Sequence, residues 1–418
     1  MKLTLISAAL CSAAVPAFAV EKADVLTNYA NIAEASYGDA LTTARKLQVA
    51  VDALITNPSA ETQQAAKTAW LAARVPYLQT EVYRFGNVIV DNWEGQVNTW
   101  PLDEGLIDYV DVSYGGATEE NAFAALNVIG TPKFVLSGSD IDATAITPDL
   151  ISKTLQDADG VITNVSTGYH AIEFLLWGQD LNGNGPGAGA RPFTDYAIGA
   201  ACTNGNCDRR AAYLQSATTL LVNDLEFMAA AWAPEGAARA TVMADETAGI
   251  LTMLTGMGSL SYGELAGERM KLGLMLNDPE EEMDCFSDNT HNSQYYDGLG
   301  IQNIYRGSYT RVDGTAVSGP SLSELVAAAD PAVNTQLTAD LEATMAAMGA
   351  MKAAADAGMT YDQMIAPGNT EGAALITAAV DGLIKQTASV ERAVVSLGVG
   401  SMALNGSDSL DNPNAVFQ

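Results

Sequence analysis

The segment from residue 168 to residue 180, GYHAIEFLLWGQD, contains the side chains best suited to chemistry. On a helix, His170 and Glu173 are three positions apart and therefore face the same way. Isoleucine, phenylalanine, leucine and tryptophan surround Glu173 in the sequence, so this helix is expected to be buried. A buried charge without a partner is strongly destabilising. The two residues therefore form either a hydrogen bond within the core or part of a metal site.

A second pair of charged residues lies on a predicted helix over residues 60–84. Arg74 and Glu81 recur with the aromatic residues Trp70 and Tyr77 at steps of three and four, so all four share one face. Long charged side chains at the edge of such a face can still reach water. If they are buried instead, they complete a polar cluster around the histidine and glutamate described above. We therefore hypothesise that charged residues from two helices converge on one buried site.

The third candidate is the acidic segment 277–291, NDPEEEMDCFSDNTH, which ends in the only other histidine of the chain. Carboxylate oxygens suit hard cations, and together with histidine they suit iron or zinc. Asp288 and His291 are therefore candidate ligands that would add to His170 and Glu173. The alternative is a solvated acidic loop without a ligand.

Several known site patterns do not fit the sequence. His-Glu-x-x-His is absent, and the inverted pattern His-x-x-Glu-His fails because Phe174 follows Glu173. Residues 180–185 match the opening of an EF-hand, but Arg191 stands at the twelfth position, where a glutamate is needed. We reject an EF-hand and leave a looser calcium site open. A metal-dependent peptidase would need an open coordination position and a base, and the sequence offers no dedicated base.

The charge balance limits the possible functions. The chain has 418 residues, with 20 Lys and Arg against 50 Asp and Glu, which gives a net charge of −30. Nucleic-acid binding depends on neutralising phosphates with basic side chains, so this balance argues against it. Hydrophobic residues make up 48% of the chain and charged residues 17%, which allows a large core.

Residues 1–19 have the pattern of an export signal. Lys2 supplies the positive charge, an apolar run follows, and Ala17-Phe18-Ala19 forms a cleavage site of the small-x-small type. The mature protein is expected to begin near Val20. No later stretch approaches the roughly 18 consecutive apolar residues of a membrane helix, so we predict no transmembrane segment. The expected location is the periplasm or the outer envelope.

Three cysteines remain after the predicted cleavage. Cys202 and Cys207 flank Thr-Asn-Gly-Asn, a flexible turn that can bring their side chains together in an oxidising compartment. We predict a disulfide between them, with a pair of metal-binding thiolates as the weaker alternative. Cys285 has no obvious mate and is expected to stay unpaired.

The spacing of apolar residues predicts an all-α protein without long strands. Helices are expected at about residues 25–55, 60–84, 163–179, 209–232, 236–254, 262–276 and 371–397. Pro76 should kink the second of these helices. Two capping boxes, Ser321 with Glu324 and Thr360 with Gln363, predict further helix starts.

The glycine-rich stretch 182–208 has neither helical nor alternating periodicity, which predicts a long surface loop. This loop is also the best candidate for a boundary between two halves of the chain. We therefore expect two helical bundles packed together, over residues 20–205 and 206–418. Their similar size is what an internal duplication would produce, although spacing alone shows no repeat.

Several long motifs occur in one order along the chain. They are AWLAARVPYLQTEVYRFG from residue 69, GYHAIEFLLWGQDLNGNG from residue 168, CTNGNCDRRAAYL from residue 202, TGMGSLSYGELAGERM from residue 255 and CFSDNTH from residue 285. With these motifs, and above all Gly-x-His-x-x-Glu, the chain resembles the imelysin-like family over about residues 30–397. It looks close to the iron-regulated protein A branch of that family.

The resemblance implies an exported or envelope-associated all-α protein of two bundles that is linked to iron acquisition. The family is classed by name among metallopeptidases. His170 and Glu173 match the family motif directly, and Glu81 stands at the position of its acidic residue. One departure is Met283, because this branch often has a histidine there. The departure removes one potential ligand from the acidic segment.

These observations give one leading hypothesis and two alternatives. The leading hypothesis is an extracytoplasmic, iron-linked protein that binds a metal ion or an iron-containing ligand and is not an enzyme. The metal, iron or zinc, would be held by His170 and Glu173, with help from Glu81, Asp288 or His291. The alternatives are a metal-dependent peptidase and a helical scaffold that binds another envelope protein.

Two arginines are the candidate cofactor-binding residues, Arg74 and the arginine of the GERM motif, Arg269. A metal competes with a proton for the imidazole of His170. Affinity is therefore expected to fall as the pH drops through roughly 6, close to the reference pKa of about 6.5.

Overall fold

The computed structural model describes residues 20–417 of the chain. The predicted export signal, residues 1–19, lies outside the described residues. The described part is mostly helical, and its strands form two short antiparallel hairpins. The prediction of an all-α fold without long strands is therefore confirmed.

The longer helices are α1 (Lys22–Thr56), α2 (Ala60–Leu78), α3 (Val88–Glu94), α6 (Gly168–Trp177), α7 (Cys207–Trp232), α8 (Ala237–Met243), α9 (Glu246–Ser259), α11 (Thr290–Arg306), α12 (Leu322–Ala329), α13 (Pro331–Asp356) and α15 (Thr370–Leu397). The short ones are α4 (Glu104–Ile107), α5 (Pro148–Leu150), α10 (Leu272–Leu276), α14 (Tyr361–Met364) and α16 (Asp408–Asp411). Strand β1 (Lys133–Leu136) pairs with β2 (Ser139–Asp142), and β3 (Ser308–Thr310) pairs with β4 (Ala316–Ser318).

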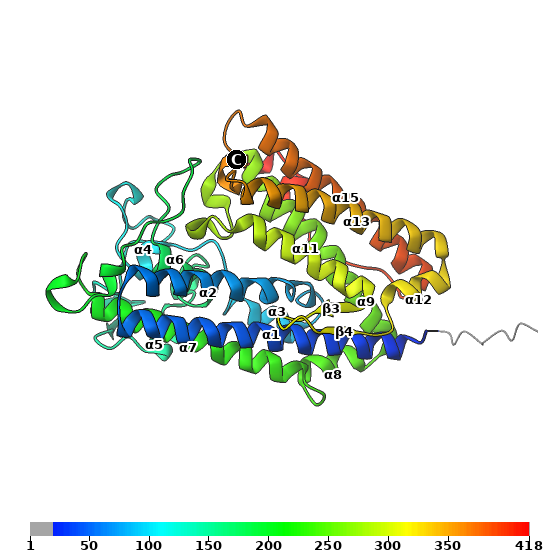
Figure 1. Cartoon of the computed structure of the whole chain (residues 1–418), viewed down its shortest axis with the longest axis horizontal. Coiled ribbons are helices and arrows are strands. Elements are labelled where there is room, and N and C mark those ends of the chain that lie inside the picture. Colours follow the sequence, from blue (N-terminus) through cyan, green and yellow to red (C-terminus); the bar gives the residue numbers. More distant parts are fainter. Residues whose placement is uncertain (1–19, 418) are drawn as a thin grey trace, which may run out of the picture.

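Helices α1, α2 and α7 form the first group, in which α1 packs against both of the others (Figure 1). The core of this group is aromatic as well as aliphatic. The ring of Tyr29 lies 4.9 Å from that of Tyr83 and 5.8 Å from that of Trp232. Such tilted and edge-on contacts add to the stabilisation from buried area. Helix α7 begins at Cys207, and the division of the chain at residues 205 and 206 stays a prediction.

The second group contains α11, α13, α15 and a long continuous helical segment, and Figure 1 shows it above the first group. This segment runs from α9 through a π-helical stretch, Leu260–Lys271, into α10. Helix α11 crosses α2 closely at Gly300. A Cβ atom there would lie 2.7 Å from the carbonyl oxygen of Gln79, so only glycine allows this approach. The crossing joins the two groups of helices.

The predicted helix starts are partly right. Ser321 and Glu324 form the expected capping box at the start of α12. The second predicted box is wrong, because the Thr360 hydroxyl donates to the carboxylate of Asp362 and caps no backbone N–H. The single helix predicted over 236–254 is two helices, since the side chain of Asp245 caps the start of α9.

The helix predicted over residues 60–84 ends earlier than expected. Pro76 lies within α2 and donates no backbone hydrogen bond, and the helix stops two residues later at Leu78. A single 3₁₀ turn, Glu81–Tyr83, follows it. The tighter turn still directs Glu81 into the core, where this residue is 2% exposed.

Helix α6 carries the motif Gly-x-His-x-x-Glu and is shorter than the predicted range 163–179, because a glycine stands at each end. Gly168 has a φ of +79°, and a Cβ atom there would lie 2.6 Å from the carbonyl carbon of Val97. The next residue, Tyr169, donates its backbone N–H to the Val97 oxygen at 2.8 Å. Gly178, with a φ of +73°, ends the helix. The glycine of the motif thus permits a close backbone contact that fixes the start of α6.

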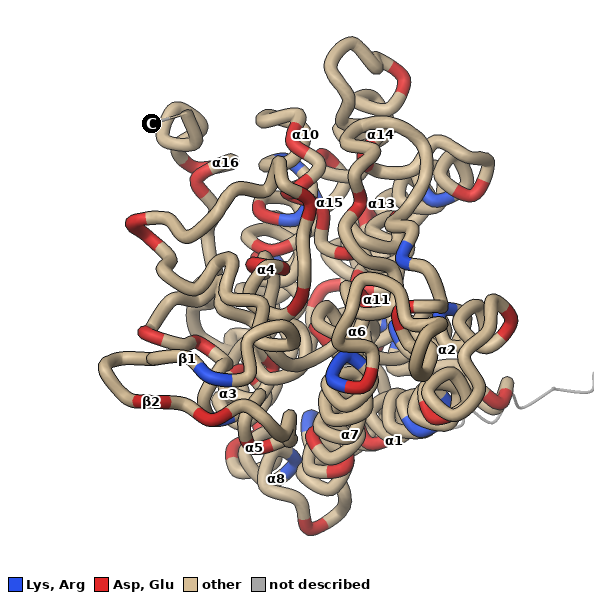
Figure 2. Tube along the Cα trace, turned by 90° about the vertical axis from the view of Figure 1, so that its left-hand side faces the viewer, with Lys and Arg blue, Asp and Glu red and all other residues tan. Residues whose placement is uncertain are grey.

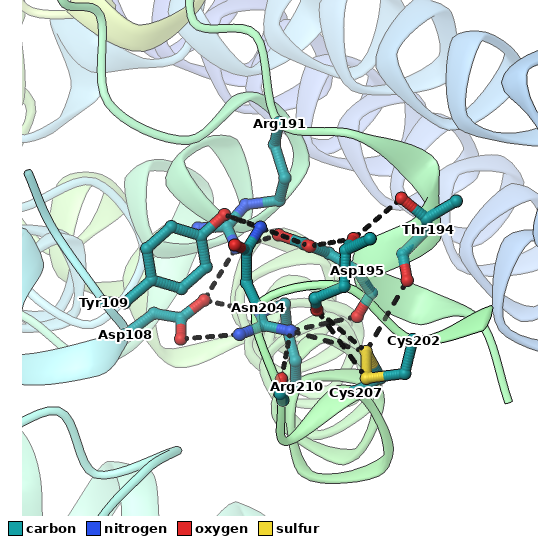
Figure 3. Close-up of a disulfide and its surroundings, with 11 residues drawn as sticks. Asp108, Tyr109, Arg191, Thr194, Asp195, Cys202, Asn204, Cys207 and Arg210 are labelled. Atoms are coloured by element: carbon teal, nitrogen blue, oxygen red, sulfur yellow. Dashed lines mark hydrogen bonds and ion pairs between the residues drawn. A yellow bond between two sulfur atoms is a disulfide. The ribbon is translucent and has the colours of Figure 1, made fainter. Parts of the chain in front are cut away.

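The predicted disulfide is confirmed, since Cys202 and Cys207 are bonded at the start of α7 (Figure 3). Cys285 is the free cysteine of the described residues. The stretch 182–208 was predicted to be a surface loop, and this is wrong for part of it, because Arg191 and Asp195 are buried.

A group of buried ion pairs lies beside the disulfide and includes Arg191 and Asp195 of this loop (Figure 3). Asp108 accepts hydrogen bonds from Arg191 at 2.7 Å and from Arg210 at 2.5 Å. Arg191 also donates to Asp195 at 3.2 Å and lies over the ring of Phe174 in α6, 5.2 Å from its centroid. Buried charges need such partners. The loop is therefore tied to the helix that carries His170 and Glu173.

Candidate metal centre

His170, Glu173 and Asp284 form a compact group in the core. The Nδ1 atom of His170 lies 3.1 Å from Glu173 Oε2 and 3.7 Å from Asp284 Oδ1. One ligand atom from each residue lies within 4.8 Å of the others, and within residues 20–417 no other His, Cys, Asp or Glu side chains meet this criterion in threes. All three side chains are fully buried, with 0% exposure. The acidic segment thus supplies a third member to the predicted pair.

The acidic segment is held against α6 by Glu173 itself. Glu173 Oε1 accepts hydrogen bonds from the backbone N–H of Ser287 at 3.0 Å and from its hydroxyl at 2.6 Å. Next to it, the ring of Phe286 lies 5.3 Å from that of Phe174. These contacts fold the 3₁₀ turn Cys285–Ser287 over the helix and bring the preceding residue, Asp284, to His170.

Arg74 is the cation of this site. Its guanidinium donates to both oxygens of Asp284, from Nη2 at 2.8 Å and from Nε at 3.4 Å. Its Nη1 atom donates to Asn98 at 2.6 Å, and the guanidinium lies 5.0 Å from the ring centroid of Tyr169. Paired hydrogen bonds of this kind fix both direction and distance. Arg74 therefore orients one carboxylate of the group.

Glu81 and Arg269 lie one step further along the same network. Asn98 Nδ2 donates to Glu81 Oε1 at 3.4 Å, and the Tyr77 hydroxyl donates to the same oxygen at 2.7 Å. Arg269 donates to the other oxygen of Glu81 at 2.8 Å. The structure thus links Glu81 to the group only through Asn98 and Arg74, and does not place it beside His170 and Glu173.

Arg269 comes from the π-helical segment, which explains how it reaches this network. The hydrogen bonds of a π-helix join residues five positions apart, so Glu264 and Arg269 lie on one side, with Arg269 Nε 3.2 Å from Glu264 Oε2. Arg269 also donates to Asp297 at 2.8 Å. Three carboxylates, those of Glu81, Glu264 and Asp297, therefore surround one buried guanidinium.

Burial controls the protonation of the group. Burial and the nearby Arg74 lower the pKa of His170 to about 3, so the imidazole is neutral at pH 6. The low pKa argues against protonation of His170 as the cause of the predicted loss of metal affinity near pH 6. Burial and the charge of Asp284 raise the pKa of Glu173 well above its usual range. Burial alone would raise the pKa of Asp284, but Arg74 outweighs it and the pKa is lowered.

Asp288 and His291 are not brought into the group. His291 Nε2 lies 3.0 Å from the amide nitrogen of Asn292 and 3.6 Å from the carboxylate of Asp356. Asp288 adopts a left-handed backbone conformation, with a φ of +54°. Burial and, to a smaller extent, the charges of Asp362 and Asp180 raise its pKa to about 7.

The sequence did not single out two residues of the site, Asp284 and Asn98. Asp284 was one of several carboxylates in the acidic segment, and only its apolar neighbours Met283 and Phe286 hint that it points inward. No sequence pattern marked Asn98 as a site residue, because it lies in an irregular connection. It joins Arg74 to Glu81 through contacts that exist only in the folded chain.

A cleft of about 360 Å³ opens beside the network. The side chains that line it include Arg84, Glu94, Asn98, Glu264, Arg269 and Met283. Asn98 contacts Arg74, and Met283 directly precedes Asp284 in the chain. The cleft therefore approaches the buried group to within one layer of side chains.

The fold and the site define an all-α protein of two packed helix groups with a buried His-x-x-Glu pair completed by a distant aspartate. A family profile described as Imelysin (Peptidase_M75) matches residues 33–390. The chain belongs to the imelysin family. Within residues 20–417, no helix is both long and apolar enough to cross a membrane.

Two solved structures have a similar fold. A structure described as an iron-regulated protein A precursor from Parabacteroides distasonis is 18% identical, with a TM-score of 0.65 over 90% of this chain and 95% of that chain. An imelysin-like protein from Psychrobacter arcticus is 16% identical, with a TM-score of 0.59 over 91% of this chain and 96% of that one. These two structures support the fold alone.

A sequence relative is the Iron-regulated protein A of Synechococcus elongatus, which is 35% identical over 72 residues. The match covers 17% of this chain and spans only 20% of the relative's length. The family is therefore established by the profile and not by this short match.

Proposed function

We propose that this is an exported imelysin-family protein that binds a divalent metal ion, iron or zinc, through His170, Glu173 and Asp284. The observation that carries the proposal is the set of one imidazole and two carboxylates whose donor atoms lie within 4.8 Å of one another. Imidazole and carboxylate ligands together suit iron and zinc. Iron is the first candidate, because two of the relatives bear the name iron-regulated protein A.

The residues present fit such an ion. Glu173 and Asp284 supply two carboxyl groups, of which only Asp284 forms an ion pair with Arg74 within the described residues. His170 is neutral at pH 6, and its Nε2 atom is buried without a hydrogen-bond partner. A bound divalent cation would take the place of the proton that the raised pKa of Glu173 favours, and would use an imidazole nitrogen. Arg74 would then position Asp284 for the ion.

The cleft beside the network gives the ion a route. Asn98 and Met283 line the cleft and stand between it and the buried group. Arg269 lines the same cleft and would contact an iron-containing ligand that arrives there. Glu81 holds Arg269 in place through their ion pair. In this proposal, Glu81 and Arg269 prepare the route, and His170, Glu173 and Asp284 hold the ion.

The burial of the group favours binding over peptide cleavage. A catalytic metal needs an open coordination position that both water and substrate can reach. The side chains of His170, Glu173 and Asp284 have 0% exposure, and a layer of side chains separates them from the cleft. A polypeptide substrate cannot approach such a group without local opening. We therefore prefer metal binding to the peptidase alternative.

The decisive experiment measures metal binding by the mature chain, residues 20–418. Fe²⁺ under anaerobic conditions and Zn²⁺ are each titrated into the chelator-treated protein by calorimetry. His170→Ala, Glu173→Gln and Asp284→Asn should each weaken binding by about tenfold or more, because one ligand is worth more than about 1.4 kcal/mol. His291→Ala is the matched control, since it removes the other histidine but lies outside the group, and should bind like the wild type.

Two results would contradict the proposal. Binding that survives His170→Ala and Asp284→Asn would place the ion elsewhere, and absence of binding by the wild type would favour the scaffold alternative. A mixed peptide library is incubated with the wild type and with His170→Ala in parallel. Metal-dependent cleavage that is lost in the variant would make the protein a peptidase.

Export is proposed from residues 1–19 alone, which have the pattern of a signal peptide. The periplasm or the outer envelope is then the site of metal binding, and its oxidising conditions agree with the disulfide between Cys202 and Cys207. Mass spectrometry of the protein from its native host should find a mature chain that begins at Val20. A chain that retains Lys2 would contradict export by this route.

A further inference from the structure

A second group of acidic side chains surrounds Glu282 and shares no residue with the group at His170. Four acidic residues, Asp180, Glu104, Glu280 and Glu282, line one small cavity. Its volume of about 10 Å³ has room for the centre of a single water-sized particle. Figure 2 shows acidic positions on α4 and α14, which carry Glu104 and Asp362. The cavity therefore has the size of one ion and an oxygen-rich lining.

The carboxylates around Glu282 are incompletely satisfied. Glu282 Oε2, Asp288 Oδ1 and Asp362 Oδ2 are buried and have no hydrogen-bond partner. Glu282 and Asp362 are each only 1% exposed. A buried carboxylate oxygen without a donor is costly, so native proteins rarely leave one unsatisfied without a reason. Three such oxygens in one region point to a cation as their partner.

No basic side chain of the described residues forms an ion pair with Asp180, Glu282, Asp288 or Asp362, unlike Asp284, which contacts Arg74. The acidic side chains instead disfavour one another's ionisation. Burial, Asp362 and Asp180 raise the pKa of Asp288 to about 7. A positive charge placed among these residues would offset this repulsion.

We propose that a Ca²⁺ ion binds between this cavity, which Glu282 and Asp180 line, and the neighbouring carboxylates of Asp288 and Asp362, with water completing its shell. An all-oxygen set of ligands is characteristic of hard cations. Calcium accepts six to eight oxygens in irregular geometry, whereas magnesium requires a regular octahedron. These residues come from three separate segments and do not form an octahedron in advance. Calcium therefore fits the site better than magnesium.

The sequence of the loop agrees with this assignment. Asp180 opens a stretch that resembles a calcium loop, but Arg191 occupies the position of the bidentate glutamate. In the folded chain Glu282 lines the cavity together with Asp180 and supplies the missing carboxylate from another segment. In this group no three ligand atoms all lie within 4.8 Å of one another, whereas those of His170, Glu173 and Asp284 do. The ion is therefore expected to draw the loop and the acidic segment together.

The loop already touches both of its partners. Asn184 Nδ2 donates to the backbone oxygen of Asp362 at 2.9 Å, and the Gly189 N–H donates to the oxygen of Phe286 at 2.9 Å. The acidic segment also carries Asp284 and Ser287, which contact the group at His170. Calcium at Glu282 would thus lock the segment that completes the iron or zinc site, although it binds elsewhere.

Calorimetry with CaCl₂ alone tests the proposal on the full mature chain after removal of metal with EDTA. The wild type should bind one Ca²⁺, and Glu282→Gln should weaken binding at least tenfold. Asp362→Asn should do the same and serves as the second variant if Glu282→Gln does not fold. Glu119→Gln removes an exposed carboxylate far along the chain and is the matched control. His170→Ala should bind Ca²⁺ like the wild type, which separates this site from the iron or zinc site.

Thermal unfolding gives a second, independent signature. Without calcium, Glu282→Gln should melt at a higher temperature than the wild type, because the substitution removes one buried negative charge. With calcium, the wild type should melt at a higher temperature than before and Glu282→Gln should not shift. The proposal is overturned if the wild type neither binds Ca²⁺ nor shifts, or if Glu282→Gln keeps the full shift. Equal binding of MgCl₂ would overturn the assignment to calcium.

Discussion

Arg74 and Asp284 stand 210 positions apart in the sequence and form a two-point ion pair in the core, with Arg74 Nη2 2.8 Å from Asp284 Oδ1. The same oxygen of Asp284 lies 3.7 Å from the imidazole of His170. Helix α2, helix α6 and the acidic segment therefore meet at one carboxylate. Stability and the candidate metal centre depend on the same contact.

Removal of Arg74 should be strongly destabilising. Arg74→Met leaves the carboxylate of Asp284 buried without its cation, which typically costs about 3–5 kcal/mol of unfolding free energy. Urea unfolding measures the loss. Arg74→Met combined with Asp284→Asn should recover part of it, because the unpaired charge is gone. Arg45 and Glu226 form an exposed pair, and Arg45→Met should cost less than about 1 kcal/mol. A loss of similar size in both single variants would contradict this account.

The glycine of the motif should tolerate no side chain. Gly168→Ala places a Cβ atom against the Val97 carbonyl at a φ of +79°, so we expect a loss of about 2–5 kcal/mol from the clash and the strain together. Gly199 has a φ of +66° but open space around it, so Gly199→Ala should cost only roughly 1–2 kcal/mol. Chemical denaturation of both variants separates the cost of the clash with Val97 from the cost of the strained backbone. An equal loss would show that the contact with Val97 is unimportant.

The buried ion pairs beside the disulfide should contribute more to the stability of the fold than the disulfide itself. The bond between Cys202 and Cys207 closes a short loop, so replacing both by serine should cost about 2 kcal/mol. Asp108→Asn takes the carboxylate away from two buried arginines and should cost about 3–5 kcal/mol. Thermal unfolding of the two variants gives the order directly. The reverse order would mean that the disulfide holds the loop.

Local features of the sequence predicted much of this structure. The spacing of His170 and Glu173, the capping box at Ser321 and the cysteine pair across a short turn each depend on residues close together in the chain. Their geometry follows from helix periodicity and turn chemistry, which act before any tertiary contact forms. These predictions therefore hold without knowledge of the rest of the fold.

Features that depend on distant partners could not be predicted in the same way. Asp284 reaches His170 only because Ser287 binds Glu173, and Asn98 joins Arg74 to Glu81 from an irregular segment. Likewise, the start of α6 is set by a contact with Val97, so the periodic apolar pattern placed it five residues too early. Periodicity shows which face of a helix is buried, but not which distant segment covers it.

A partly buried carboxylate in α7 predicts how stability changes with pH. Burial raises the pKa of Asp224 to about 6 from an ordinary value near 3.8. Between about pH 4 and pH 6 the folded protein therefore keeps a proton that the unfolded chain has lost. Stability falls as the pH rises through this window, and the full cost is present above pH 6.

Asp224→Asn removes this cost and should stabilise the protein at pH 7. A shift of two units would be worth about 3 kcal/mol, but the side chain keeps some contact with solvent, so we expect a gain of about 1–2 kcal/mol. At pH 4 the gain should be much smaller, because the aspartate is then protonated in the folded state and partly protonated in the unfolded chain. Urea unfolding of the variant and the wild type at pH 4 and pH 7 measures the difference. Glu235→Gln, at an exposed position of the loop after α7, should change neither value by more than about 0.5 kcal/mol. A gain that is equal at both pH values would show that packing, and not the buried charge of Asp224, is responsible.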